Sequence, residues 1–113
     1  SQLAQTTLRS VIGQSELAMM KRDAILINTA RGPLVDENAL LTALRAGEIG
    51  GAGLDVLVQE PPEPGSSILD TGLDNLVITP HTAWASRESR QRLVDDIAEN
   101  IKLWRQGTPR NLV

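Results

Sequence analysis

Three short apolar segments alternate with amphipathic ones along this chain, and this order restricts its fold more than any other feature. The apolar segments are residues 24–28 (AILIN), 50–57 (GGAGLDVL) and 75–80 (NLVITP). A short continuous apolar run such as AILIN predicts a strand that is covered on both faces. Strands that alternate with helices indicate an α/β fold whose strands run parallel and are joined by right-handed crossovers.

Capping residues predict the first two helices. Ser15 is the expected N-cap of a short helix over about residues 16–22, which ends in basic residues. Asp36 is the expected N-cap of a second helix, and Gly47 ends it. The apolar face of this second helix consists of leucines: Leu40, Leu41 and Leu44.

A third helix follows the last strand. It begins after Ser86 as the expected N-cap, and it stops at Gly107. Its apolar stripe runs at helical spacing through Leu93, Ile97, Ile101 and Trp104, with Val94 and Ala98 beside it. A proline-rich loop over residues 59–74 separates the second strand from the third.

Composition excludes several classes of protein. The net charge of −3 provides no basic face for nucleic acid. No apolar run approaches the roughly 18–20 residues that span a bilayer, so we expect no membrane partner. The absence of cysteine fits a reducing cytoplasm, where we expect the protein to act. With two tryptophans and neither phenylalanine nor tyrosine, the core must be aliphatic and rich in alanine.

The glycines of residues 47–53 (GEIGGAG) look like a phosphate-binding loop but stand in the wrong place. A dinucleotide fingerprint needs a strand, then G-x-G-x-x-G, then a helix, whereas this segment precedes a strand. We therefore interpret Gly50, Gly51 and Gly53 as residues that allow close packing of a helix on a strand.

Polar residues follow each predicted strand, where parallel sheets place their ligand sites. Arg31 follows the first strand, before a Gly-Pro turn, and its guanidinium can bind a substrate carboxylate or simply pair with an acidic neighbour. Glu60 lies after the second strand, and Pro61 restricts its backbone to an extended conformation. Its carboxylate is either a directed functional group or an ordinary charge on a loop.

Asp55 and His81 complete this set. A carboxylate at the end of a buried strand needs a partner, so Asp55 either caps a neighbouring helix or binds a ligand amide. His81, the only histidine, follows the third strand directly and can donate a proton to a developing alkoxide. One histidine with scattered carboxylates does not match a metal-ligand set, so we expect no metal.

Two long runs of this sequence resemble the D-isomer-specific 2-hydroxyacid dehydrogenases, which use a nicotinamide cofactor. They are LAMMKRDAILINTARGPLVDENALLTALRAGEIGGAGLDVLVQEPP and NLVITPHTAWASRESRQRLVDDIAENI. The segments PHTAWASRE and PRNLV are most similar to the glycerate dehydrogenase (hydroxypyruvate reductase) branch. The resemblance implies the second half of a Rossmann-type doubly wound parallel sheet, three strands with flanking helices.

The resemblance also assigns a catalytic set. Arg31 would bind the carboxylate and carbonyl of the substrate. His81 would be the acid/base that protonates the carbonyl oxygen as hydride arrives. Glu60 would hydrogen-bond His81 and keep it protonated for reduction.

Cofactor contacts are implied in the same way. Asp55 would hold the nicotinamide carboxamide of NAD or NADP, and Thr29 and Ala30 would line the cofactor beside it. Arg31 and His81 would border it as well. The residues after the histidine would border the nicotinamide and the substrate pocket: Thr82, Ala83 and Trp84. Contacts of the first ten residues (SQLAQTTLRS) are not carried over, because they match the family only loosely.

The implied enzyme interconverts a small 2-keto acid, with hydroxypyruvate or glyoxylate favoured, and its D-2-hydroxy acid. Residues 1–113 would be the C-terminal part of a dinucleotide-binding domain, and about residues 100–113 would return toward a substrate domain. We expect the isolated chain to be inactive, and marginally stable or associated, because half a doubly wound sheet leaves an edge and a face uncovered. The whole protein would be a homo-oligomer, in the form of a dimer.

Two other functional classes are compatible with parts of the pattern. One is a non-catalytic interaction module, similar to corepressor relatives of these dehydrogenases. The other is a flavodoxin-like or receiver domain, but the chain lacks the phosphate loop or acidic pocket that such a domain needs at its first strand.

Overall fold

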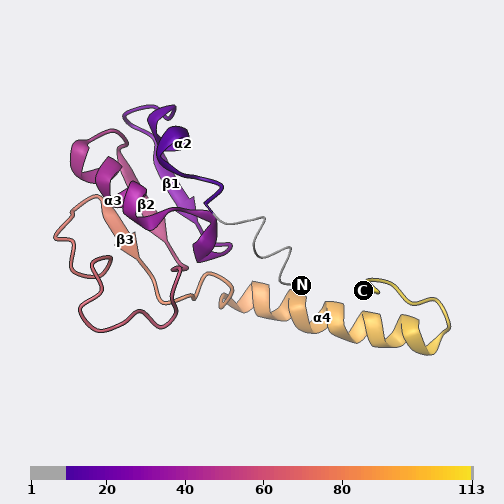
Figure 1. The fold of residues 1–113 in the computed structure, drawn as a ribbon. Coiled ribbons are helices and arrows are strands. Elements are labelled where there is room, and N and C mark those ends of the chain that lie inside the picture. Colours follow the sequence, from indigo (N-terminus) through magenta and orange to yellow (C-terminus); the bar gives the residue numbers. More distant parts are fainter. Residues whose placement is uncertain (1–9, 113) are drawn as a thin grey trace. The chain divides into compact units, whose positions relative to one another are not determined.

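A computed structural model of the chain describes residues 10–112 and divides it into two compact units, residues 1–81 and 82–113. Figure 1 shows the elements of both units. They are, in order, α2 (Gln14–Ala18), β1 (Ile25–Asn28), the 3-10 turn η1 (Gly32–Leu34), α3 (Glu37–Ala46), β2 (Gly51–Leu54), β3 (Leu76–Ile78) and α4 (Arg87–Arg105). Except for Ser10, the N-terminal segment set aside above lies outside the described residues.

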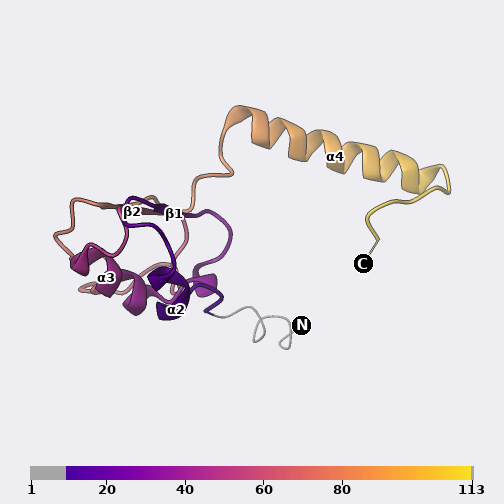
Figure 2. The same ribbon diagram turned by 90° about the horizontal axis from the view of Figure 1, so that it is seen from above.

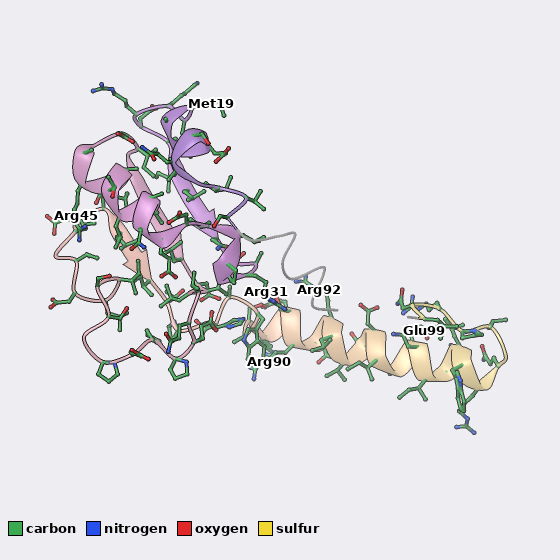
Figure 3. The ribbon with its side chains drawn as sticks, viewed as in Figure 1. Met19, Arg31, Arg45, Arg90, Arg92 and Glu99 are labelled. Carbon is green, nitrogen blue, oxygen red and sulfur yellow. The ribbon has the colours of Figure 1, made fainter. Side chains whose placement is uncertain are left out.

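The three strands form one parallel sheet, as the sequence predicts, and the structure gives their order as β1-β2-β3. Ile27 pairs with Gly53, which in turn pairs with Val77. Because the strands are parallel, their carboxyl ends meet at one edge. Figure 3 shows Arg31 at this end of the first unit and Met19 at the other.

Most of the predicted helix ends are confirmed. Asp36 caps α3, and its carboxylate accepts a hydrogen bond of 3.0 Å from the amide of Ala39. Gly47 ends α3 with φ of +67°, a left-handed conformation that favours glycine. Ser86 caps α4, and Gly107, with φ of +76°, follows its last turn.

The first helix differs from the prediction. Its N-cap is Gly13 and not Ser15, and it ends at Ala18, with Met19 as C-cap, instead of continuing to about residue 22. The helix begins at Gln14, so Ser15 lies inside its first turn, and the Glu16 carboxylate accepts the Gly13 amide at 2.9 Å at the helix start.

The described helices of the first unit cover only one face of the sheet. Figure 2 shows α2 and α3 together on one side of the strands. An aliphatic core lies beneath them, as composition predicts; its most deeply buried members are Leu17, Leu40, Ile49 and Leu54. On the opposite face Ile25, Ile27 and Val77 are 67%, 69% and 62% exposed. The prediction that AILIN is covered on both faces is therefore wrong for this chain.

Gly50 and Gly51 face backbone instead of a helix, and Gly53 faces the side chain of Ile27, 3.9 Å from an added β-carbon. A β-carbon on Gly50 would lie 2.9 Å from the carbonyl oxygen of Asp23, and one on Gly51 would lie 3.1 Å from that of Asn75. Our interpretation of close helix–strand packing is thus corrected: Gly50 and Gly51 allow neighbouring segments of backbone to approach, and Gly53 contacts the neighbouring strand β1 and not a helix.

The second unit consists mainly of α4. Its apolar stripe is exposed, from 49% at Ile97 to 69% at Trp104. Arg110 contacts Asp96 and Asn100 on the outside of the helix. Among residues 10–112, no helix is both long and apolar enough to cross a membrane.

The open face of the sheet predicts how the 113-residue chain behaves when it is expressed alone. We expect it to associate and to sediment well above its monomer mass of 12.2 kDa, because three large aliphatic side chains on one face are exposed. Replacing Ile25, Ile27 and Val77 together by threonine, which keeps strand propensity, should return it toward monomer. Met19→Thr, at an exposed site away from this face, is the matched control. A monomeric wild-type chain with a cooperative melt would contradict this expectation.

Candidate functional site

The loop after β1 holds Arg31 through a buried asparagine. The Asn28 side chain, 6% exposed, donates to the carbonyl of Arg31 at 2.9 Å and accepts from the amide of Ala30 at 3.1 Å. Arg31 itself is exposed, and its guanidinium donates to the carbonyl of Ala30 at 2.7 Å. The sharp turn after the strand is thus closed by Asn28, so that the arginine is presented at the carboxyl edge of the sheet.

Asp55 follows β2 and is buried, with 5% exposure. The hydroxyl of Thr79 donates to its Oδ1 atom at 2.5 Å, so the carboxylate is held by the strand next to its own. Asp55 and Thr79 both line a cavity of about 410 Å³ at the carboxyl ends of β2 and β3. Glu60 and His81 line the same cavity, together with an apolar wall that includes Leu69 and Ile78.

Glu60 and His81 are joined directly. Oε2 of Glu60 lies 2.7 Å from Nδ1 of His81, while Oε1 accepts the amide of Leu57 at 2.8 Å. Each carboxylate oxygen therefore has its own task, one fixing the glutamate to its loop and the other engaging the imidazole. The two side chains are 35% and 43% exposed, so the pair remains open to a ligand on one side.

The backbone at His81 is unusual for a residue with a side chain. Its φ is +55°, and its amide donates to the carbonyl of Thr79 at 3.0 Å. Residues other than glycine that hold a left-handed conformation concentrate at functional sites. This turn aims the imidazole back at the loop that carries Glu60.

Hydrogen bonds hold the pKa of Glu60 below its ordinary value of 4.5. The largest cause is the amide of Leu57, and the second is the side chain of His81. Both stabilise the ionised carboxylate, which is the form that can accept a hydrogen bond from a protonated Nδ1 of the histidine. The local structure thus favours a charged glutamate beside the imidazole.

The structure brings some of the predicted residues together and leaves others apart. Glu60, His81 and Asp55 share one cavity, whereas Arg31 lies on the neighbouring loop and does not line it. Thr29 and Ala30 are exposed on that same loop. The three predicted residues after the histidine begin the second unit and are exposed: Thr82, Ala83 and Trp84.

Three residues of this region were not singled out from the sequence: Asn28, Glu37 and Thr79. Asn28 binds the loop of Arg31, and Thr79 binds Asp55. Glu37 accepts a hydrogen bond of 2.6 Å from the amide of Val58. For Asn28 and Thr79, the position of a polar residue at the end of an apolar strand was a signal. Within residues 10–112, no cluster of three or more candidate ligand side chains could hold a metal ion.

The polar groups at this edge fit the carboxamide end of a nicotinamide cofactor. A carboxamide offers N–H donors, and the buried carboxylate of Asp55 is an acceptor that borders the cavity. The exposed backbone of Thr29 and Ala30 stands at the end of the next strand. Open parallel α/β sheets bind their ligands at this edge, and the α/β nucleotide-binding domains are the class that this fold and edge match.

The comparisons with known proteins specify the family within that class. Residues 3–83 match the model of the D-isomer specific 2-hydroxyacid dehydrogenase, NAD binding domain. The chain belongs to this family, as the resemblance implied.

Curated relatives match this chain in sequence. The chain is 54% identical over 105 residues to a glycerate dehydrogenase of Methylorubrum extorquens, and 49% identical over 104 residues to a glyoxylate reductase of Korarchaeum cryptofilum. These matches cover 93% and 91% of this chain but only 33% and 31% of the relatives. The chain therefore spans about a third of the length of these relatives.

Solved structures give the same result. An acyclic imino acid reductase in complex with NADPH and D-Arg superposes with a TM-score of 0.78 and 38% identity, over 95% of this chain and 33% of that one. A D-lactate dehydrogenase of Lactobacillus jensenii with NAD+ superposes with a TM-score of 0.74 and 32% identity, over 96% and 36% of the two chains. The fold of a Rossmann-like NAD-binding domain is thus confirmed.

The lowered pKa of Glu60 can be tested directly. We expect a ¹³C NMR titration of its carboxyl group, assigned with Glu60→Gln, to show a midpoint below 4.5. His81→Ala should raise this midpoint only in part, because the Leu57 amide is the larger cause. The contribution of Glu60 to the free energy of unfolding is then complete above about pH 4.5 and is lost as the pH falls through the lowered folded-state pKa. A midpoint at or above 4.5 in the wild-type protein would contradict this account.

Proposed function

We propose that the protein is an NAD(P)-dependent oxidoreductase that reduces a small 2-keto acid to its D-2-hydroxy acid. The observation that carries the proposal is the 2.7 Å contact between His81 and Glu60 at the carboxyl edge of a nucleotide-binding sheet. A ketone reduction by hydride needs an acid for the oxygen and a cation for the carboxylate. Both groups stand at this edge.

The cofactor, when bound, supplies the hydride. We assign its nicotinamide carboxamide to Asp55, whose orientation Thr79 supports. Thr29 and Ala30 would line the cofactor at the end of β1. The residues that would border the nicotinamide and substrate pocket are Thr82, Ala83 and Trp84. The assignment covers NAD and NADP equally.

Arg31 binds the carboxylate and carbonyl of the keto acid. A guanidinium can donate two parallel hydrogen bonds to a carboxylate, which fixes the plane of the substrate as well as its position. Asn28 holds the backbone on both sides of this arginine, at Ala30 and at the arginine's own carbonyl. Orientation of the ketone is therefore a task of the loop after β1.

His81 donates the proton that the carbonyl oxygen needs. Its Nδ1 faces Oε2 of Glu60, so transfer to the substrate takes place from Nε2. The ionised glutamate stabilises the imidazolium form before transfer and accepts the Nδ1 hydrogen bond throughout. In the reverse direction the neutral imidazole removes the hydroxyl proton from the D-2-hydroxy acid.

The relatives suggest which keto acids to test first. The names of the matching proteins include glycerate dehydrogenase, glyoxylate reductase and hydroxypyruvate reductase. We therefore propose hydroxypyruvate or glyoxylate as substrate. We further propose a cytoplasmic dimer in which residues 1–113 form the C-terminal part of the dinucleotide-binding domain and about 100–113 return toward the substrate domain. The isolated chain would be inactive.

Replacing His81 by alanine tests the proton donor. In the longest available form of the protein, we expect kcat for hydroxypyruvate reduction with NADH or NADPH to fall about 100-fold to 10,000-fold, the usual contribution of a general acid. Binding of the reduced cofactor, followed by its fluorescence, should persist and thus report a folded site. A kcat within tenfold of wild type would exclude His81 as the acid. If the wild-type protein itself turned over no keto acid, the interaction-module alternative would be favoured.

Replacing Arg31 by leucine tests the carboxylate clamp. We expect the KM for the keto acid to rise about 10-fold to 150-fold, since a charge-assisted bidentate contact is lost at a cost of roughly 1.5–3 kcal/mol. Arg45→Leu is the matched control, because Arg45 lies in the last turn of α3, at a distance from the loop of Arg31 (Figure 3). The control should leave KM unchanged. Equal effects of the two substitutions would rule out a specific role of Arg31.

A further inference from the structure

Glu37 forms a contact that the proposed mechanism does not use. It is the first residue of α3, and its Oε1 accepts the amide of Val58 at 2.6 Å, across 21 residues of sequence. Val58 lies in the loop between β2 and Glu60. The contact therefore joins the helix start to the loop that aims Glu60 at the histidine.

The anchor of this contact is rigid. Asp36 caps α3 just before Glu37, and the helix packs its leucines into the core, with Leu40 fully buried. A carboxylate in the first turn of a helix is also favoured by the helix dipole. Glu37 thus projects from a fixed backbone position, whereas the loop it contacts consists of irregular structure.

The peptide group between Leu57 and Val58 is held from two sides. Its N–H is bound by Glu37, while its carbonyl lies against Gly32, where an added β-carbon would be only 1.9 Å from the oxygen. The preceding amide, that of Leu57, donates to Glu60. Leu57 thus lies between two hydrogen-bonded amides, its own and that of Val58. The direction in which the Leu57 amide points toward Glu60 therefore depends on the hydrogen bond between Val58 and Glu37.

We propose that Glu37 is a positioning residue for the Glu60–His81 pair, acting through the Leu57–Val58 peptide. The inference rests on the proposed function. Loss of the hydrogen bond between Glu37 and the Val58 amide lets this peptide rotate. The rotation weakens the hydrogen bond from Leu57 to Glu60 and displaces the carboxylate that faces His81. Misplacement of a catalytic group by about 1 Å costs on the order of 100-fold in rate.

Three substitutions at Glu37 in the longest available form of the protein separate this role from a general effect on stability. Glu37→Ala removes the acceptor. Glu37→Asp keeps the charge in the first turn but withdraws the carboxylate by one methylene, and it serves as the second variant if the alanine protein does not fold. Glu37→Gln keeps an acceptor oxygen at the right length. Glu48→Ala, which removes an acidic residue just after the same helix, is the control.

Two readouts are expected to move together. The kcat for keto-acid reduction should fall about tenfold to 100-fold in the alanine and aspartate variants, with the KM for cofactor within about twofold. The midpoint of the Glu60 carboxyl titration should rise toward 4.5 in the same two variants. The glutamine variant should stay within about threefold of wild-type kcat, and Glu48→Ala should change neither readout.

Other outcomes would overturn the proposal. A wild-type kcat and Glu60 titration in the aspartate variant would show that the Val58 contact does not position the pair. A lower kcat or melting temperature with an unchanged Glu60 titration would show that Glu37 only stabilises the fold. If the wild-type protein turned over no keto acid, the proposed function would fail, and the titration by itself would decide the role of Glu37.

Discussion

The close approach of two loops, at a single peptide group, is the constraint on which the site depends. The loop after β1 carries Arg31 and the loop after β2 carries Glu60, and they touch where Gly32 lies against the carbonyl of Leu57. No side chain could be accommodated at position 32, since a β-carbon added there would overlap this carbonyl. The spacing between Arg31 and the Glu60–His81 pair is therefore set by backbone contact, which is stiffer than contact between flexible side chains.

Backbone groups and polar side chains hold the remaining parts of the site. Asn28 bridges the turn around Arg31, Thr79 fixes Asp55, and the Leu57 amide fixes Glu60. A buried amide or carboxylate must be hydrogen-bonded, because an unpaired neutral group costs about 1–3 kcal/mol and a charged one costs more. Each of these contacts satisfies a polar group of the fold and orients a functional group at the same time. The parallel sheet makes this possible by bringing three strand ends to one edge.

The sequence predicts those features of the chain that are determined locally. The caps at Asp36 and Ser86 and the stop at Gly47 follow from side chains within three residues of the backbone they serve. Ser15 is not the cap because the helix begins before it, at Gln14, where the Glu16 carboxylate binds the amide of Gly13. Glu37 and Thr79 act through contacts that only the fold creates, over 21 and 24 residues. Asn28 binds its own loop, at Ala30 and Arg31, and its position at the end of an apolar strand was a signal. The exposed face of Ile25 and Ile27 was missed for the same reason, since AILIN indicates burial without saying which elements provide it.

The strained turn at His81 follows from these constraints. A left-handed conformation costs a residue with a β-carbon roughly 1–2 kcal/mol, and histidine tolerates it better than branched residues do. The amide of His81 recovers a hydrogen bond to Thr79, and its ring recovers one to Glu60. Thr79 also donates to Asp55, so a single residue of β3's end supports both the histidine backbone and the aspartate. The conformation that directs the imidazole toward the glutamate is thus maintained by the same hydrogen bonds that shape the cavity. These bonds couple the Glu60–His81 pair to Asp55, the proposed cofactor contact.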